Sequence, residues 1–330
     1  MPLLQVRDLV KVYPGGVRAV DGISFSVEEG EIFGFLGPNG AGKTTTIRIL
    51  VTLLEPTSGY AAVDGIDVTE GPEDVRTRIG YAAQFIGVDN DLTGYENLVM
   101  QGRLHGLDRA EAERRSKELL DVLQLVDAAD RRAGTFSGGM RRRLDLGQAL
   151  VHDPRVLFLD EPTTGLDPQT RRALWEYLRV LNDRGVTILL TTQYLEEADA
   201  LASRMAIIDQ GVIAVEGTPA RLKRDLGGEA ITVTLPDDSG NSDIDTAAAV
   251  LGRFSDEGEA DRFDHSIRVF TADASSRLAD VVRALDSASV KVASLELSEP
   301  TLDDVFLRHT GSRMRVEEAK PPSRLMRRRR

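Results

Sequence analysis

The chain has 330 residues, a formal net charge of −12 and no cysteine. Its length allows one large α/β domain and a smaller one, and the lack of cysteine excludes disulfides, thiol nucleophiles and cysteine-ligated zinc. An acidic body disfavours nucleic acid as a partner, because broad binding to a phosphate backbone needs a basic face. No apolar run approaches the ~20 residues needed to cross a bilayer, and the N-terminus lacks a signal-peptide pattern. We therefore expect a cytoplasmic protein that does not itself form a pore.

The first predicted elements in chain order lead to a glycine-rich loop. Strand-like segments at residues 6–13 and 23–37, the second ending in apolar IFGFL, precede the sequence GPNGAGKT. This sequence fits G-x-x-x-x-G-K-[ST], and a helix-like stretch follows it from Thr45, so backbone N–H groups can surround a phosphate. The loop consists of Gly37, Pro38, Asn39, Gly40, Ala41, Gly42, Lys43 and Thr44.

Two side chains of this loop have predicted roles. We expect Lys43 to neutralise β- and γ-phosphate oxygens and the Thr44 hydroxyl to bind Mg²⁺. A glycine-rich turn that opens a helix could instead be only a cap. The match at every position, between a strand and a helix, favours the phosphate loop. The sequence therefore predicts ATP and Mg²⁺ as cofactors.

A helical subdomain is predicted in the middle of the chain. Sheet-like YAAVDGIDV and IGYAAQ lead to Gln84, and helical periodicity then dominates over about residues 92–151. Within it, FSGGM at Phe136–Met140 precedes a helix-like stretch, whose first N–H groups and positive dipole end can bind an anion. One phosphate loop does not require a second phosphate-binding helix start, so this segment indicates a further contact with nucleotide.

Two adjacent acids follow the next strand-like run, VLFLD. Asp160 ends this run and Glu161 comes next, at the carboxyl edge where parallel α/β sheets bind ligands. Asp160 can hold Mg²⁺ directly or through water, and Glu161 is placed to take a proton from an attacking water. Both acids could merely cap the following segment, but two acids after a buried strand are costly to place without a cation.

The remaining pattern gives the fold class and domains. Strand–helix alternation resumes to about residue 228, and a further alternation follows. We predict an α/β fold, with a mixed sheet core and the helical subdomain in residues 1–228, a small α+β domain at 229–311, and a basic, disordered tail at 312–330. This tail is either solvated or in contact with anionic lipid. The histidines show no ligand spacing and are predicted to be surface or capping residues: His105, His152, His265 and His309.

Over about residues 3–225 the sequence resembles the nucleotide-binding subunits of ATP-binding cassette (ABC) transporters. In that family the signature Ser137, Gly138 and Gly139 contact the γ-phosphate held by the opposite subunit. The resemblance also implies that three further residues serve the site. Tyr13 would stack on adenine, Gln84 would sense Mg²⁺ and the membrane partner, and Asp167 would cross the dimer interface. Taken singly, Tyr13 could be an ordinary half-buried strand aromatic and Gln84 a solvated loop residue.

Two positions depart from the family pattern. Met140 replaces the usual glutamine after the signature glycines, so the loop can pack through an apolar side chain. Gln193, in TTQYLEEAD, replaces the switch histidine; it can donate an N–H to the γ-phosphate but cannot become cationic. Both variants resemble daunorubicin/doxorubicin-resistance exporters. The LDDVF ending at Leu302–Phe306 is also similar to the terminal segment of such subunits, although helical spacing predicts a core-facing stripe there.

The resemblance implies an ATPase that forms a homodimer around two ATP molecules and drives a separate polytopic permease to export a hydrophobic, drug-like or lipid-like compound. The subunit would lie on the inner face of the cell membrane, and residues 85–98 would form a groove for the permease. The alternative is a soluble ABC-type ATPase acting on nucleic acid or the ribosome. The chain has one cassette, no room for a coiled coil between Gln84 and Ser137, and no zinc cysteines. A stand-alone phosphotransferase would leave FSGGM unexplained.

Overall fold

The computed structural model describes residues 2–256, 258 and 260–311, and the predicted tail at 312–330 lies outside this part of the chain. The described residues form two compact units, the first ending at Gly217 and the second starting at Thr218. The boundary thus falls before the predicted one at residue 228. The reason is that helix α8 (Pro219–Arg224) contacts helix α11 (Leu302–Thr310) of the second unit.

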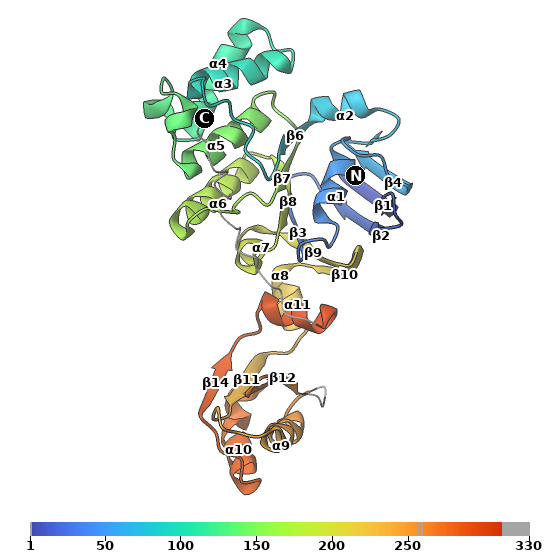
Figure 1. Ribbon diagram of the computed structural model, residues 1–330, viewed down its shortest axis with the longest axis vertical. Coiled ribbons are helices and arrows are strands. Elements are labelled where there is room, and N and C mark those ends of the chain that lie inside the picture. The colour runs from blue at the N-terminus through green and yellow to red at the C-terminus, as the bar shows by residue number, and fades with distance from the viewer. Residues whose placement is uncertain (1, 257, 259, 312–330) are drawn as a thin grey trace, which may run out of the picture. The chain divides into compact units, whose positions relative to one another are not determined.

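Two sheets form the body of the first unit (Figure 1). The antiparallel sheet has the order β2-β1-β4-β5, and the larger sheet has the order β10-β9-β3-β8-β7-β6. In the larger sheet, β9, β3, β8, β7 and β6 are parallel, and β10 is antiparallel to β9. The strands of the antiparallel sheet are β1 (Leu4–Val12), β2 (Arg18–Val27), β4 (Ser58–Val63) and β5 (Ile66–Asp67). Those of the larger sheet are β3 (Ile32–Leu36), β6 (Ile79–Ala82), β7 (Val156–Asp160), β8 (Thr187–Thr192), β9 (Arg204–Asp209) and β10 (Val212–Gly217).

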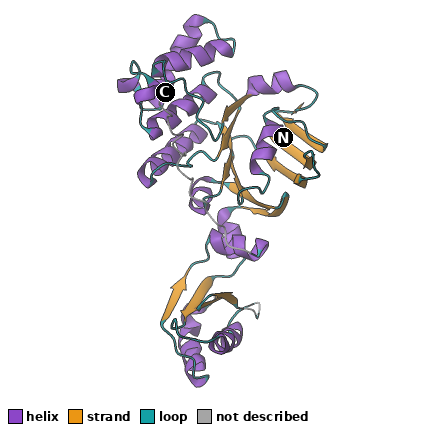
Figure 2. Cartoon of the chain, viewed as in Figure 1, coloured by secondary structure: helices purple, strands orange, loops and turns teal. Residues whose placement is uncertain are grey.

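Helices cover the larger sheet and build the helical subdomain (Figure 2). Every residue of β3, β7 and β8 is buried, as expected for the central strands of a parallel sheet covered on both faces, and the apolar runs of β3 and β7 fit this burial. The helices are α1 (Lys43–Leu50), α2 (Pro72–Arg78), α3 (Gly94–Leu104), α4 (Arg109–Val122), α5 (Gly138–Leu150), α6 (Pro168–Asp183) and α7 (Leu195–Leu201). Short 3₁₀ turns at Val126–Ala128 and Ala133–Thr135 join α4 to α5.

Two hydrophobic clusters hold the first unit together. One lies between the two sheets and α1 and includes Phe33, Phe35 and Ile47. The other joins the larger sheet to α3–α6 and includes Leu144 and Trp175. Because α5 packs against β6, the second cluster fixes the helical subdomain to this edge strand. β6 is the neighbour of β7, the strand that ends at Asp160.

The second unit is a β-α-β-β-α-β fold with an added helix at each end. Its antiparallel sheet has the order β12-β13-β11-β14, the ferredoxin-like arrangement. The elements between α8 and α11 are β11 (Glu229–Thr234), α9 (Asn241–Gly252), β12 (Asp261–Phe263), β13 (Ser266–Thr271), α10 (Ala274–Ser287) and β14 (Ser294–Ser298). Alternate strand residues such as Ile231 and Val269 share one core with Leu251 of α9 and Val281 of α10. The sequence analysis missed β12, which is only three residues long.

Helix α11 contains the LDDVF segment. Leu302, Val305 and Phe306 are all buried, so the predicted core-facing stripe is confirmed. Asp304 accepts a hydrogen bond from the Thr301 backbone N–H at 2.8 Å and pairs with Arg268 of β13 at 2.7 Å. This acid therefore caps the helix and ties it to the sheet of the second unit.

Candidate active site

The glycine-rich loop is held in place by close backbone contacts at two glycines. A Cβ on Gly37 would lie 2.3 Å from the carbonyl oxygen of Ile208. Gly42 has φ +109°, and a Cβ there would lie 2.4 Å from the carbonyl oxygen of Ala19. No side chain fits at either position, so glycine is required for the loop to leave β3 and enter α1 at this angle.

Lys43 and the start of α1 provide the positive charge of the site. Lys43 is 4% exposed, and its ammonium donates to the carbonyl oxygens of Gly37 at 2.6 Å and Pro38 at 3.0 Å. Burial lowers the pKa of Lys43, and Glu161 and Asp160 oppose this shift. Gly42 gives no side-chain cap to α1, and the first turn of α1 contains no acid. Free N–H groups beside a buried ammonium fit the oxygens of a phosphate group.

Asp160 and Thr44 supply oxygen atoms next to this positive end. Asp160 is 1% exposed, and its Oδ1 accepts from Thr44 Oγ1 at 3.1 Å and from Thr191 Oγ1 at 2.6 Å. The part of the chain that the structure describes contains no group of three or more His, Cys, Asp or Glu side chains that could by itself hold a metal ion. Mg²⁺ is commonly held by one or two carboxylates with substrate phosphates and water, so one carboxylate and a hydroxyl beside a phosphate loop fit this ion.

Glu161 is the meeting point of the site. Its backbone has φ +47° and its side chain is 7% exposed. The carboxylate lies 3.6 Å from Lys43 Nζ and accepts from Gln84 Nε2 at 3.3 Å and from Gln193 Nε2 at 3.5 Å. Thr164 Oγ1 donates to it at 3.2 Å. Gln84, Glu161 and Gln193 follow β6, β7 and β8, which are neighbours in the sheet, so the topology brings three distant segments to one carboxylate.

Tyr13 lies at the edge of this site. Its hydroxyl is 3.4 Å from Thr45 Oγ1, and its ring is half-buried. The ammonium of Lys11 lies over the ring, 5.6 Å from its centroid. An aromatic ring next to the start of α1 is placed to contact a group that extends from the phosphate loop.

The signature segment and Asp167 are separate from this cluster. Ser137 caps α5 by accepting from the Met140 N–H at 3.3 Å, and Asp167 caps α6 by accepting from the N–H groups of Gln169 and Thr170. α5 packs on β6, which is three strand spacings from β3, roughly 14 Å. A Cβ on Gly139 would lie 2.4 Å from Thr170 Cγ2, so the two helix starts are neighbours.

Met140 packs against the core that joins α3–α6 to the sheet. The predicted apolar packing at this position is therefore confirmed. The sequence analysis did not identify Thr164, Thr191 or Arg142 as contributors to the site. The threonines at the end of TILLTT and in PTTGLD were the available signals for the first two, whereas Arg142 resembled one exposed member of an arginine run.

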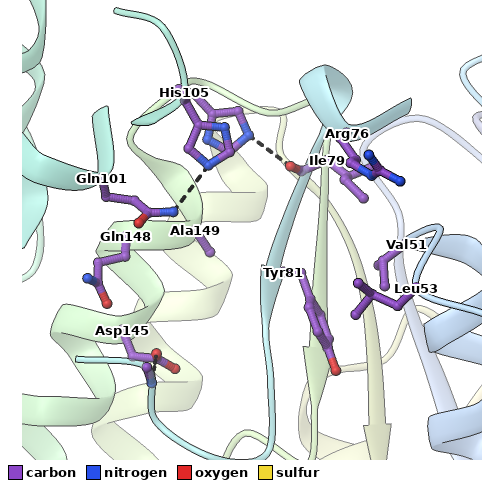
Figure 3. Close-up of a pocket in the computed structure, with 12 residues that line it drawn as sticks. Val51, Leu53, Arg76, Ile79, Tyr81, Gln101, His105, Asp145, Gln148 and Ala149 are labelled. Atoms are coloured by element: carbon purple, nitrogen blue, oxygen red, sulfur yellow. Dashed lines mark hydrogen bonds between the residues drawn. The ribbon is translucent and has the colours of Figure 1, made fainter. Parts of the chain in front are cut away.

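A groove of about 340 Å³ lies between the helical subdomain and the sheet (Figure 3). One side carries Gln101 of α3 and Asp145 of α5, and the other carries Tyr81 of β6 with Leu53. Gly87, from the segment after Gln84, also lines it. Among the described residues, no helix has the length and apolar character needed to span a membrane.

Two histidines meet at the end of this groove. His105 is exposed and caps the C-terminus of α3, as predicted for a surface or capping residue, whereas His152 is only partly exposed. The rings of His105 and His152 stack with centroids 3.7 Å apart and an angle of 3° between their planes. The His152 Nε2 lies 2.8 Å from the Ile79 carbonyl oxygen. Burial and the neighbouring His105 lower the pKa of His152 to about 4. Their separation in sequence concealed the pair, because α3 and α5 meet only in the folded subdomain.

The fold and this site define a nucleotide-hydrolysing cassette, with a phosphate loop, an acid pair and a separate signature helix. The pattern of the ABC transporter family matches residues 20–164, and that of the C-terminal domain of ATP-binding proteins like DrrA1-3 matches residues 217–310. The chain belongs to the ABC transporter family and is an ATPase subunit of it.

Similar proteins of known name support both of these family matches. The daunorubicin resistance ATP-binding protein DrrA2 of Streptomyces coeruleorubidus is 48% identical, over 93% of this chain and 94% of its own. The linearmycin resistance ATP-binding protein LnrL of Bacillus subtilis is 36% identical, over 95% of this chain and 100% of its own. These relatives do not favour the alternative of an ATPase acting on nucleic acid or the ribosome.

A solved structure has the same cassette fold. CbiO1 of Clostridium perfringens, part of the ABC transporter complex cbiONQ, has a TM-score of 0.63 and 26% identity, covering 67% of this chain and 90% of its own. A dimeric cassette solved with ADP and phosphate has a TM-score of 0.59 and 25% identity, covering 65% of this chain and 98% of its own.

Proposed function

We propose that the chain powers an exporter, binding ATP and Mg²⁺ as a homodimer and acting on a separate membrane permease that moves a hydrophobic, drug-like or lipid-like compound out of the cell. The observation that carries the catalytic part is the convergence of Lys43, Gln84 and Gln193 on Glu161. The names of two relatives, a daunorubicin resistance and a linearmycin resistance ATP-binding protein, support the export part.

In the proposed mechanism the phosphate loop binds ATP. The Lys43 ammonium exchanges the carbonyls of Gly37 and Pro38 for β- and γ-phosphate oxygens, which carry more negative charge. Tyr13 stacks on the adenine ring, and Thr44 and Asp160 hold Mg²⁺ with Gln84 close to it. The ion supplies neutralisation of phosphate charge when bound.

Hydrolysis needs a base and a donor at the γ-phosphate. Glu161 takes the proton of the attacking water, and Gln193, whose amide already reaches Glu161, donates an N–H to the phosphate. Among the described residues the Gln193 Oε1 is buried without a hydrogen-bond partner. Such a group is costly to leave unsatisfied, which supports a role in contacting water or ligand.

Two copies complete each site. Gly138 is exposed, and a Cβ there would have nothing within 4 Å, so contacts within the described chain do not require a glycine. Approach by a nucleotide on another copy would require it. In this arrangement Ser137, Gly138 and Gly139 of one copy meet the phosphate loop of the other, and Asp167 lies at the interface.

The groove that Gly87 lines, shortly after Gln84 in the chain, is the proposed docking site of the permease. It is lined by Gly87 and Asp145 and lies between the helical subdomain and the sheet. Phe85, next to Gln84, is 86% exposed, which suits a surface that a partner covers. Docking there would hold the subunit at the inner face of the membrane, and the basic tail at 312–330 could add contact with anionic lipid.

Replacement of Glu161 by glutamine tests the catalytic part. With ATP and Mg²⁺, the Glu161→Gln variant should bind nucleotide, fail to hydrolyse it, and elute in size-exclusion chromatography at twice the subunit mass. Glu176→Gln, an exposed acid on α6, is the matched control and should turn over normally. A Glu161→Gln variant that stays monomeric and active would refute the assignment of Glu161 as the base. The proposed membrane partner has its own test: failure of the natural protein to co-purify with a polytopic membrane protein would refute it.

A further inference from the structure

Arg142 is a buried cation that the mechanism so far leaves unused. It lies in the second turn of α5 and is 3% exposed. Its Nε donates to the carbonyl oxygen of Pro162 at 2.8 Å, and its Nη1 donates to the carbonyl oxygen of Ala83 at 2.7 Å. One guanidinium therefore binds the backbone of two loops that are far apart in sequence.

These two carbonyls flank the catalytic groups. Ala83 comes directly before Gln84, and Pro162 directly after Glu161. The two loops leave β6 and β7, which are paired in the sheet, and their side chains meet where Gln84 Nε2 reaches Glu161 Oε2. By binding both backbones, Arg142 fixes the separation of the two loops.

The turn at Glu161 needs such support. Its φ of +47° is unfavourable for a residue with a Cβ, and a conformation of this kind persists only where surrounding contacts impose it. The Glu161 N–H is bound by Thr191 Oγ1 at 3.1 Å. Arg142 holds the following residue, so the strained turn is fixed on both sides.

Asp145 orients the guanidinium. Its Oδ2 accepts from Arg142 Nη1 at 2.9 Å, and its Oδ1 accepts from the Gly87 N–H at 2.9 Å. Asp145 is 7% exposed, and burial raises its pKa while Arg142 opposes the shift. Asp145 and Gly87 also line the groove in Figure 3. The contacts thus run from the groove wall through Asp145 and Arg142 to Pro162.

We infer that Arg142, oriented by Asp145, is a positioning residue that sets Glu161 and Gln84 in their hydrolytic arrangement. The inference rests on the proposed role of Glu161 as the base. A lysine cannot replace the arginine, because a single ammonium cannot reproduce the planar guanidinium that donates in fixed directions to both carbonyls and to Asp145.

Steady-state ATP hydrolysis by the full chain tests this inference. Because a catalytic group displaced by about 1 Å can lose ~10²-fold in rate, Arg142→Met should lower kcat by about that factor. The KM for ATP should change by less than about twofold, since the phosphate loop is untouched. Arg142→Lys, which keeps the buried charge, should still lower kcat by about tenfold. Natural kcat in Arg142→Lys would overturn the inference.

Asp145→Asn tests the path through the ion pair. Alone it should lower kcat, and in the Arg142→Met background it should cause no further loss, because both changes then act on the same contact. Fully additive losses would show that Asp145 acts independently and would overturn its assignment as the orienting residue.

The double variant Glu161→Gln/Arg142→Met separates positioning from a general defect in α5. With ATP and Mg²⁺ it should form the same trapped dimer as Glu161→Gln alone, because the signature at the start of α5 remains intact. Loss of the dimer in the double variant alone would assign Arg142 to the signature helix and overturn the inference. Loss in Glu161→Gln itself would instead refute the proposed base.

Discussion

At the residue scale, Glu161 is held by neutral amides as well as by a cation. Gln84 and Gln193 both donate to one carboxylate oxygen, Oε2, and Lys43 lies beside the other. An imidazole at position 193 would add a group that titrates near neutral pH, whereas the glutamine does not. The chemistry of the site should therefore be less sensitive to pH than that of a histidine-containing cassette.

Substitution of Gln193 measures this difference. Gln193→Ala should lower turnover by about 10²-fold, because a donor to the transition-state phosphate is lost, and it should leave ATP affinity nearly unchanged. Gln193→His should stay active and gain an inflection in its rate between about pH 6 and 7.5. The measurement is ATPase rate against pH with the permease present. Full activity in the alanine variant, or equal profiles for histidine and glutamine, would exclude the role.

At the element scale, the packing of α3 against α5 brings His105 onto His152. The stacked rings lie where the helical subdomain meets the carbonyl of Ile79 at the start of β6. Burial and His105 lower the pKa of His152 to about 4, Arg115 adds to this shift, and Asp153 opposes it. The folded protein thus favours the neutral ring, whereas the unfolded chain takes up a proton near pH 6.5.

This difference predicts a pH-dependent stability. The contribution of His152 to the free energy of unfolding should be complete above about pH 6.5 and lost as the pH falls towards 4. We expect a loss of about 2 kcal/mol, allowing for the partly exposed ring. Urea unfolding can be followed through Trp175, the single tryptophan of the chain, which lies in the first unit.

The control for this prediction lies in the second unit. His152→Gln should reduce the decline in stability between pH 6.5 and 4, because the amide does not titrate. His265→Gln changes a histidine outside the unit that Trp175 reports, so it should keep the natural decline. An unchanged decline in His152→Gln would show that other groups govern acid stability.

At the scale of the whole molecule, the phosphate loop and the signature segment lie apart within one described chain. In the proposed homodimer they come together from two copies. The Ser137→Arg variant should bind ATP normally and hydrolyse little, since in the proposed homodimer the signature serves the nucleotide of the other copy. Lys43→Ala should lose about tenfold to a hundredfold in ATP affinity. Mixing the two inactive proteins should restore activity, because one kind of heterodimer site combines an intact phosphate loop with an intact signature. No recovery above the separate proteins would contradict the shared site.

Local sequence determined much of this protein. The phosphate loop, the acid pair after β7 and the signature capped by Ser137 each lie within one short segment, where residue type and spacing suffice to predict the chemistry. The apolar runs IFGFL and VLFLD likewise predicted that β3 and β7 are buried strands. These features depend on contacts between residues close in sequence.

Tertiary structure decided what distant segments share. The meeting of Gln84, Glu161 and Gln193 depends on the strand order β8-β7-β6, and the resemblance, not their spacing, indicated their common site. No local sequence pattern predicted three other features: the link from Arg142 to Ala83 and Pro162, the stacking of His105 on His152, and the membership of α8 in the second unit. The pattern of apolar and polar side chains predicts which residues of one helix or strand are buried. Which residues of different elements contact one another is fixed only when the whole core packs.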